Sequence, residues 1–297
     1  MLHKQEITAG IRALGIKPGD TLMAHSSLKS FGEVDGGVDA VIDGILDAVG
    51  PNGHVLMPAL SATYTSNQGG LYFHRAKTPS RVGYLTEAFR ARPGTARSEH
   101  PTHSLSCRGP RAAELTSQHH WKDGSTFHLD SPYAKMVQAG AKIAFFGVIP
   151  SCNTTYHAIE DWLEWPYSSV SWARLEEDDG TKKTVKVTRA PLGPRGFYSR
   201  NDRIHPRMEA EGAITKGVIG PCAAQVLDAQ MMVRLCLKWE LAEPGLFLHA
   251  EGTPDRFSNY WRPILKGMKS ATLEKARLIL ARGLGGKGTT VDKLTGS

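Results

Sequence analysis

Long apolar runs are missing from this chain of 297 residues, and its mean hydropathy is −0.30. No stretch approaches the roughly 20 apolar residues that a helix needs to cross a bilayer. The first six residues also lack the apolar core of a secretory signal. We therefore expect a cytoplasmic protein with no membrane partner.

Cysteine is scarce, and the four residues present (107, 152, 222 and 236) do not follow the spacing of a metal site. Free thiols in a reducing compartment are the simplest interpretation. The net charge is +7, yet no block of Lys and Arg is interleaved with aromatic residues, so we expect no nucleic-acid partner. A Walker A sequence and a GxSxG nucleophile elbow are also absent. The positive charge leaves an anionic cofactor open.

Apolar residues make up 40% of the chain, which is enough for a sizeable core. Helical and strand-like patterns alternate at the start, with helices over 3–15 and 38–49 and strands over 21–25 and 54–58. This alternation predicts an α/β fold with a mixed central sheet flanked by helices. Alternating Val, Trp and Thr around Asp178-Asp179-Gly180 predict a small antiparallel hairpin inserted at about 168–190.

Other segments complete the expected organisation. We expect a single domain over 1–265, followed by a C-terminal helix and a loose Gly-rich tail over 266–297. Residues 61–80 are polar, aromatic and Gly-rich, which indicates a mobile loop over a site. The remaining expectations are a helix over 82–91, a strand over 141–146, a loop over 191–206, short strands over 211–221 and a helix over 223–238.

The most informative motif follows the buried strand that ends before Gly147. Asn153, Thr154 or Thr155 can cap a new helix, because their side-chain oxygens accept from the free N–H groups of its first turn. His157 and Glu160 are three residues apart and lie on one face of that helix. A carboxylate at this spacing can orient an imidazole, which then serves as a general base near neutral pH. The alternative is a surface pair worth a few tenths of a kcal/mol.

Two further motifs remain open at this point. Residues 25–29, His-Ser-Ser-Leu-Lys, follow a strand, and ligands of α/β sheets bind at that edge, although an ordinary turn has the same composition. Four histidines (His100, His103, His119 and His120) could bind zinc or act as structural residues, but their spacing matches no known ligand set. We therefore expect no metal.

Together these segments resemble the aminoglycoside 3-N-acetyltransferase family, the coenzyme-A-dependent antibiotic acetyltransferases that differ in fold from the GCN5-related enzymes. The resemblance spans roughly residues 3–240, and Asn-Thr-Thr-x-His-x-x-Glu at 153–160 is its most specific part. The other similar pieces, in order, are His25-Ser26-Ser27-Leu28, Phe31-Gly32, Met57-Pro58-Ala59, His100-Pro101, Ser104, Ser131-Pro132, Gly147 and the glycines at 212, 217 and 220.

The resemblance implies acetyl-CoA as the acyl donor, a small-molecule amine as the acceptor, and a monomer or homodimer. It makes His157 the general base, Glu160 its orienting carboxylate and Thr155 a candidate donor to the thioester oxygen. His25, Ser26, Ser27, Lys29 and Ser104 are the expected cofactor-binding residues. Tyr64 and Asp161 are the expected substrate contacts, because acidic residues beside aromatic ones suit a cationic substrate.

One departure leaves the acceptor open. The resemblance implies acidic proteins that suit polycationic drugs, whereas this chain carries a net charge of +7. A smaller or anionic amine is therefore an alternative acceptor. A further alternative is a coenzyme-A-binding relative without turnover.

Overall fold

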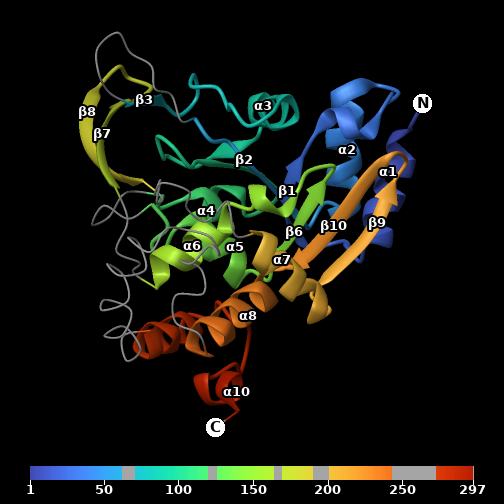
Figure 1. Cartoon of the computed structure of the whole chain (residues 1–297). Helices are drawn as coiled ribbons and strands as arrows, with labels where there is room; N and C mark the ends of the chain where they lie inside the picture. The colour runs from blue at the N-terminus through green and yellow to red at the C-terminus, as the bar shows by residue number, and fades with distance from the viewer. Residues whose placement is uncertain (62–70, 120–125, 164–168, 190–200, 243–271, 297) are drawn as a thin grey trace.

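A seven-stranded mixed sheet forms the centre of the computed structural model, which describes residues 1–61, 71–119, 126–163, 169–189, 201–242 and 272–296 (Figure 1). Its strand order is β4-β5-β2-β1-β6-β10-β9. The three central strands β2, β1 and β6 are parallel, so their carboxyl ends lie at one edge of the sheet. The strands are β1 (Thr21–Ser26), β2 (His54–Pro58), β4 (Ala96–Arg97), β5 (Leu105–Arg108), β6 (Lys142–Phe146), β9 (Ile214–Ile219) and β10 (Cys222–Asp228).

Helices cover both faces of this sheet. Side chains of a strand point alternately to opposite faces, so Leu22 and Ala24 of β1 join one core cluster and Met23 joins the other. The face of Leu22 is covered by α1 (Lys4–Ala13), α2 (Gly37–Val49) and α3 (Tyr84–Ala91). The face of Met23 is covered by α4 (Ala112–Thr116), α5 (Pro132–Gln138), α6 (Thr155–Trp162), α7 (Asn201–Ala210) and α8 (Ala229–Ala242). The predicted α/β class with a mixed sheet is confirmed.

A second, three-stranded sheet contains the predicted hairpin. β7 (Ser169–Glu176) pairs antiparallel with β8 (Lys182–Arg189), and β3 (Leu71–His74) adds to β7 in parallel. Phe73, Leu175 and Val187 belong to a separate small core cluster of this sheet. In Figure 1 the small sheet lies at the opposite end of the molecule from α1 and β9.

Three sequence-based predictions of local structure were wrong. The helix expected over 223–238 begins only at Ala229, because residues 222–228 form β10 between β6 and β9. The loop expected over 191–206 is wrong for its last six residues, because α7 starts at Asn201 and contains Pro206 in its interior, while residues 191–200 lie outside the described ranges. Finally, β3 forms within the loop expected over 61–80, whose residues 62–70 lie outside the described ranges.

The C-terminal segment packs against the face of Met23. Residues 272–281 are helical, and α10 (Val291–Thr295) follows. Leu284 and Val291 are buried in the same core cluster as α5 and α8, so this end of the chain is packed. The domain boundary expected at residue 265 lies outside the described residues and stays a prediction. Among the described helices, none combines the length and apolarity that crossing a bilayer requires.

Candidate active site

The turn between β6 and α6 places the start of α6 at the carboxyl edge of the sheet. Gly147 adopts φ +66°, and its backbone N–H donates to the carbonyl of Ala223 at 2.8 Å. A Cβ atom at this position would overlap the hydroxyl of Ser30, which is why only glycine fits. Thr154 is the N-cap residue of α6 and makes no side-chain capping bond, but Oδ1 of Asn153 accepts from the N–H of Thr155, the first residue of the helix, at 3.1 Å.

His157 and Glu160 form a buried pair on α6. The Nδ1 of His157 lies 2.8 Å from Oε2 of Glu160, and the two residues are 4% and 2% exposed. Because a carboxylate only accepts, Nδ1 carries the hydrogen of this contact. This burial excludes the alternative of a solvated surface pair, and the contact with Glu160 orients the imidazole of His157.

His25 lies near the carboxyl end of β1, on the same face of the sheet as α6. Its ring stacks on Phe145 of β6, with centroids 5.5 Å apart and planes 12° apart. Burial lowers the pKa of the His25 imidazole from 6.5 to about 4, so the ring is neutral at pH 7. Ser26 and Ser27 follow, and the N–H of Ser27 donates to the carbonyl of Phe146, while Lys29 lies exposed on a short 3₁₀ helix (Leu28–Phe31).

Several of the predicted site residues have buried polar atoms with no hydrogen-bond partner among the described residues. Buried polar groups are nearly always paired, so an unpaired one points to a ligand or water. These atoms are Nε2 of His25, Oγ of Ser26, Oγ1 of Thr155 and Oε1 of Glu160. Their chemistry suits a ligand that is rich in carbonyl and amide groups.

The other predicted residues differ in their surroundings. Ser104 donates to the carbonyl of Ala59 and accepts from Nε of Arg97, so its hydroxyl is engaged with the protein. Asp161 is half-buried on α6, next to Glu160. Tyr64 lies outside the described ranges. The roles of all three residues stay predictions.

The histidines expected as a possible metal set come together partly. His100 and His119 stack with their centroids 4.6 Å apart, and His103 lies 6.1 Å from His100. Burial and the neighbouring histidines lower the pKa of His100 well below 6.5. Within the described ranges no group of three or more His, Cys, Asp or Glu side chains is arranged to hold a metal, and His120 lies outside them.

Sequence reasoning missed the aromatic surroundings of His157. The ring of Phe127 lies 6.2 Å from that of His157 and 4.8 Å from that of Tyr133, and both aromatic residues are buried. The indole of Trp162 donates to the carbonyl of Phe127 at 2.6 Å. An isolated aromatic residue between polar neighbours carries no periodic signal, so nothing in the sequence marks Phe127.

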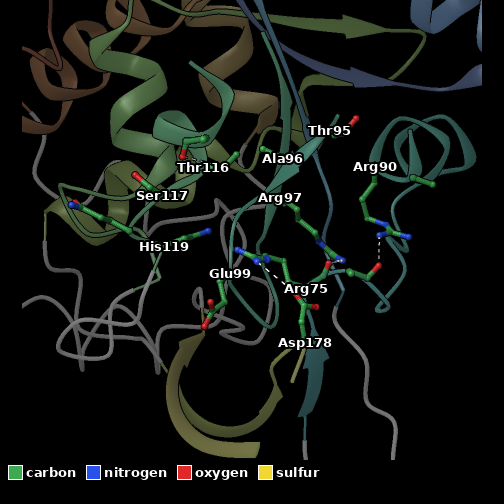
Figure 2. A pocket seen from close by; sticks show the side chains of 14 residues that line it. Arg75, Arg90, Thr95, Ala96, Arg97, Glu99, Thr116, Ser117, His119 and Asp178 are labelled. Atoms are coloured by element: carbon green, nitrogen blue, oxygen red, sulfur yellow. Dashed lines mark hydrogen bonds and ion pairs between the residues drawn. The ribbon is translucent and has the colours of Figure 1, made fainter. Parts of the chain in front are cut away.

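A pocket of about 790 Å³ opens beside His119, between β4, α4 and the loop after β3. In Figure 2, Arg75, Arg97 and Arg90 lie across from Ser117 and His119. Arg97 is fixed by the carbonyls of Ala59, Arg75 and Thr78, and burial lowers the pKa of its guanidinium to about 9. His157, Glu160 and His25 do not line this pocket, which is therefore distinct from the candidate active site.

Comparison with known proteins identifies the family. Residues 23–240 match the family described as aminoglycoside 3-N-acetyltransferase. The chain belongs to this family. The match confirms the resemblance and makes the chain an enzyme of the aminoglycoside N-acetyltransferase kind.

Individual members of the aminoglycoside 3-N-acetyltransferase family align over most of their length. The chain is 26% identical to aminoglycoside N(3)-acetyltransferase VII of Streptomyces paromomycinus, over 80% of this chain and 90% of that protein. The structure of AAC-IIIb in a binary complex with CoASH is 24% identical, with a TM-score of 0.71 over 80% of this chain and 95% of that one. AAC-VIa bound to sisomicin is 25% identical, with a TM-score of 0.70 over 81% and 97%.

Proposed function

We propose that this chain moves the acetyl group of acetyl-CoA to an amine of an aminoglycoside, with His157 as the general base and Glu160 as its orienting carboxylate. The observation that supports this most directly is the buried 2.8 Å contact between these two side chains at the carboxyl edge of the sheet. Family membership supplies the reaction class.

The chemistry requires a base at this position. An amine is protonated at pH 7, and it must lose a proton before its nitrogen lone pair can attack the thioester carbon. The ammonium first gives one proton to solvent water. As the neutral nitrogen attacks, His157 takes a second proton from it through Nε2, while Glu160 stabilises the resulting imidazolium. The new C–N bond forms as the C–S bond breaks, and the proton on His157 passes to the departing sulfur, which leaves as the thiol. The Thr155 hydroxyl is a candidate donor to the oxygen that gains negative charge.

The end of β1 is the proposed site of the donor. The buried Nε2 of His25 and Oγ of Ser26, which have no partner among the described residues, would hydrogen-bond to the amide and carbonyl groups of the pantetheine arm. Ser27 and Ser104 are proposed as further contacts to the donor. Lys29 is exposed and positively charged, which suits a phosphate of coenzyme A. The fold neighbour AAC-IIIb was solved with CoASH, which is consistent with this donor.

The acceptor is proposed to be a 2-deoxystreptamine drug, since AAC-VIa binds sisomicin and the relatives are named for aminoglycosides. Asp161 and Tyr64 are the proposed contacts to its ammonium groups. The net charge of +7 favours one second candidate, a smaller amine that carries a phosphate or phosphonate. We propose that the enzyme acts in the cytoplasm as a monomer or homodimer and needs no metal.

A direct transfer is proposed in place of an acetyl-cysteine intermediate. Cys152 lies five residues before His157, but burial raises the pKa of its thiol to about 12. The reactive form of cysteine is the thiolate, and a thiol with so high a pKa forms little thiolate at neutral pH. We therefore propose that both substrates bind before transfer.

Thiol release from acetyl-CoA tests the function. Purified protein is expected to release free CoA with an aminoglycoside, and His157→Ala is expected to lower turnover by about 10²–10⁴-fold. His205→Ala is the control, because His205 also contacts a glutamate of its own helix, with Nε2 2.9 Å from Oε1 of Glu209 on α7. Release with a phosphate-bearing amine alone would move the assignment to the second candidate. Tight binding of acetyl-CoA without release for any amine would indicate a relative without turnover.

A further inference from the structure

The pocket of about 790 Å³ between β4, α4 and the loop after β3 is lined by charged side chains of both signs. Figure 2 shows Arg75, Arg90 and Arg97 together with the two acidic residues, Glu99 and Asp178. The residues proposed above for catalysis and for binding of the acetyl donor do not line it. The balance of these charges therefore decides what the pocket can hold.

Both carboxylates of the pocket already face a cation. Oε1 of Glu99 lies 3.3 Å from Nζ of Lys183. Oδ1 of Asp178 lies 3.7 Å from Nε2 of His74, and its Oδ2 lies 3.8 Å from Nη2 of Arg75, which is too long for a hydrogen bond. The side chain of Arg75 is 56% exposed and forms no hydrogen bond with a residue that the structure describes. Its N–H groups are therefore available to a ligand.

Arg97 is a buried cation whose hydrogen bonds go to neutral groups. The residue is 8% exposed, and a guanidinium has five N–H donors. Four of them donate to the carbonyls of Ala59, Arg75 and Thr78 and to the hydroxyl of Ser104. The second N–H of Nη2 has no acceptor in the described part of the chain.

The carboxylate of Glu87 on the neighbouring α3 does not balance this charge. Glu87 accepts from Nε and Nη2 of Arg90 at 2.7 and 2.6 Å, and from the N–H of Ser80 at 2.7 Å. Its charge is thus matched by Arg90, and Arg97 keeps an excess positive charge beside the pocket. Removing a charge from water is unfavourable unless an opposite charge lies beside it, so an anion in the pocket would stabilise the buried guanidinium.

We propose that this pocket binds an anion of the phosphate type, held by the remaining N–H of Arg97 and by the guanidinium of Arg75. The two residues are in contact, because Arg97 donates to the carbonyl of Arg75 at 2.9 Å. Guanidinium groups present several N–H donors in one plane, which suits the oxygens of a phosphate. The side chain of Gln118 lines the same pocket and adds a neutral polar contact. The site does not depend on the role of His157.

Calorimetric titration with inorganic pyrophosphate at constant ionic strength tests the site. We expect one saturable site in each chain, and about 10-fold weaker binding in Arg75→Gln, which removes a charged donor at the exposed side of the pocket. Arg111→Gln is the matched control. The side chain of Arg111 is 55% exposed, pairs with a single carboxylate, that of Glu114, and lies outside the pocket.

A second variant should act in the opposite direction. Asp178→Asn removes the carboxylate that competes for Arg75, so pyrophosphate should bind about two- to fivefold more tightly. Asp179→Asn makes the same change in net charge at the next exposed position, which does not line the pocket, and should leave the affinity unchanged. This pair separates a local site from general attraction by the net charge of +7.

Two sources share this chemistry, free phosphate compounds and the phosphate groups of coenzyme A. If the occupant is a phosphate group of coenzyme A, coenzyme A should displace pyrophosphate from the Arg75-dependent site, whereas pantetheine should not. If the occupant is a separate phosphate compound, both should leave pyrophosphate bound. Either result keeps the site and names its source.

Three results would overturn the proposal. The first is the absence of saturable binding of pyrophosphate to the wild-type protein. The second is an equal loss of affinity in Arg75→Gln and Arg111→Gln, which would reduce the effect to surface charge. The third is equal binding by Asp178→Asn and the wild type, since Asp178 would then have no influence on the occupant.

Discussion

The Glu160 side chain uses one carboxylate oxygen to orient His157, and its second oxygen has no partner within the described part of the chain. Glu160→Gln separates orientation from charge, because the amide oxygen can still accept from Nδ1 while the negative charge is lost. We expect kcat to fall by about tenfold in Glu160→Gln and by about a further tenfold in Glu160→Ala, which loses both. Steady-state kinetics of the two variants measure this difference.

The control for this pair lies on α7. Glu209 contacts His205 at the surface, so Glu209→Gln should leave kcat unchanged. Equal activity of wild type, Glu160→Gln and Glu160→Ala would remove the proposed carboxylate from the mechanism.

Gln118 adopts a backbone conformation that favours glycine. Its φ is +57°, just past the end of α4, where a left-handed residue commonly terminates a helix. A side chain in this conformation costs roughly 1 kcal/mol, so Gln118→Gly should raise the free energy of unfolding by about that amount. Urea denaturation measures it, with Gln138→Gly at the end of α5 as a control that should destabilise. A less stable Gln118→Gly protein would contradict the prediction.

The turn between β6 and α6 depends on one glycine. Gly147→Ala adds both the left-handed backbone penalty and an overlap with the Ser30 hydroxyl, so we expect a loss of about 2–4 kcal/mol of unfolding free energy. Gly140→Ala separates the two effects, because Gly140 has φ +69° and open space around a Cβ atom. It should cost only about 1 kcal/mol. Equal losses in the two variants, measured by chemical denaturation, would remove the steric argument.

Elements with a strong period were predictable from the sequence, and those with a competing pattern were not. The early helices and strands were found because each shows one apolar face, as do Ile7 and Ile11 of α1. Residues 222–228 were assigned to a helix because Ala, Val and Leu suit both structures, and only pairing with β6 and β9 makes them a strand. Proline inside a helix removes a hydrogen bond, so Pro206 argued against a helix and α7 was not predicted.

The candidate site was predicted only where its residues share a local motif. His157 and Glu160 are close in sequence, and their spacing alone indicates a contact on a helix. Phe127 reaches the same imidazole from about thirty residues away, through a segment without regular structure. A long-range contact of this kind depends on the packing of α5 and α6, which no pattern within one segment contains.

At the scale of the whole molecule, buried neutral histidines should make the fold acid-sensitive. The unfolded His25 binds a proton below pH 6.5, whereas burial lowers the pKa of the folded ring to about 4. The unfolded state therefore takes up the proton first, so this stabilisation is complete above pH 6.5 and is lost as the pH falls toward 4. The shift corresponds to roughly 3 kcal/mol, and the lowered pKa of His100 acts in the same direction.

Denaturation in urea at several pH values between 7.5 and 4.5 measures this effect. His25→Asn should lose stability less steeply than the wild type over this range, and His3→Asn, at an exposed position, should follow the wild type. Identical slopes for wild type and His25→Asn would show that His25 does not contribute.

The burial of Leu284 and Val291 beside α5 and α8 has a consequence for synthesis on the ribosome. The half of the core that supports α6 cannot close until residues near 291 have left the exit tunnel, although the half under α1 and α2 is complete much earlier. Nascent chains arrested at residue 265 should thus protect α1 and α2 from protease while α6 remains open to cleavage. The last segment to be translated would then be the one that completes the core cluster to which α6 belongs.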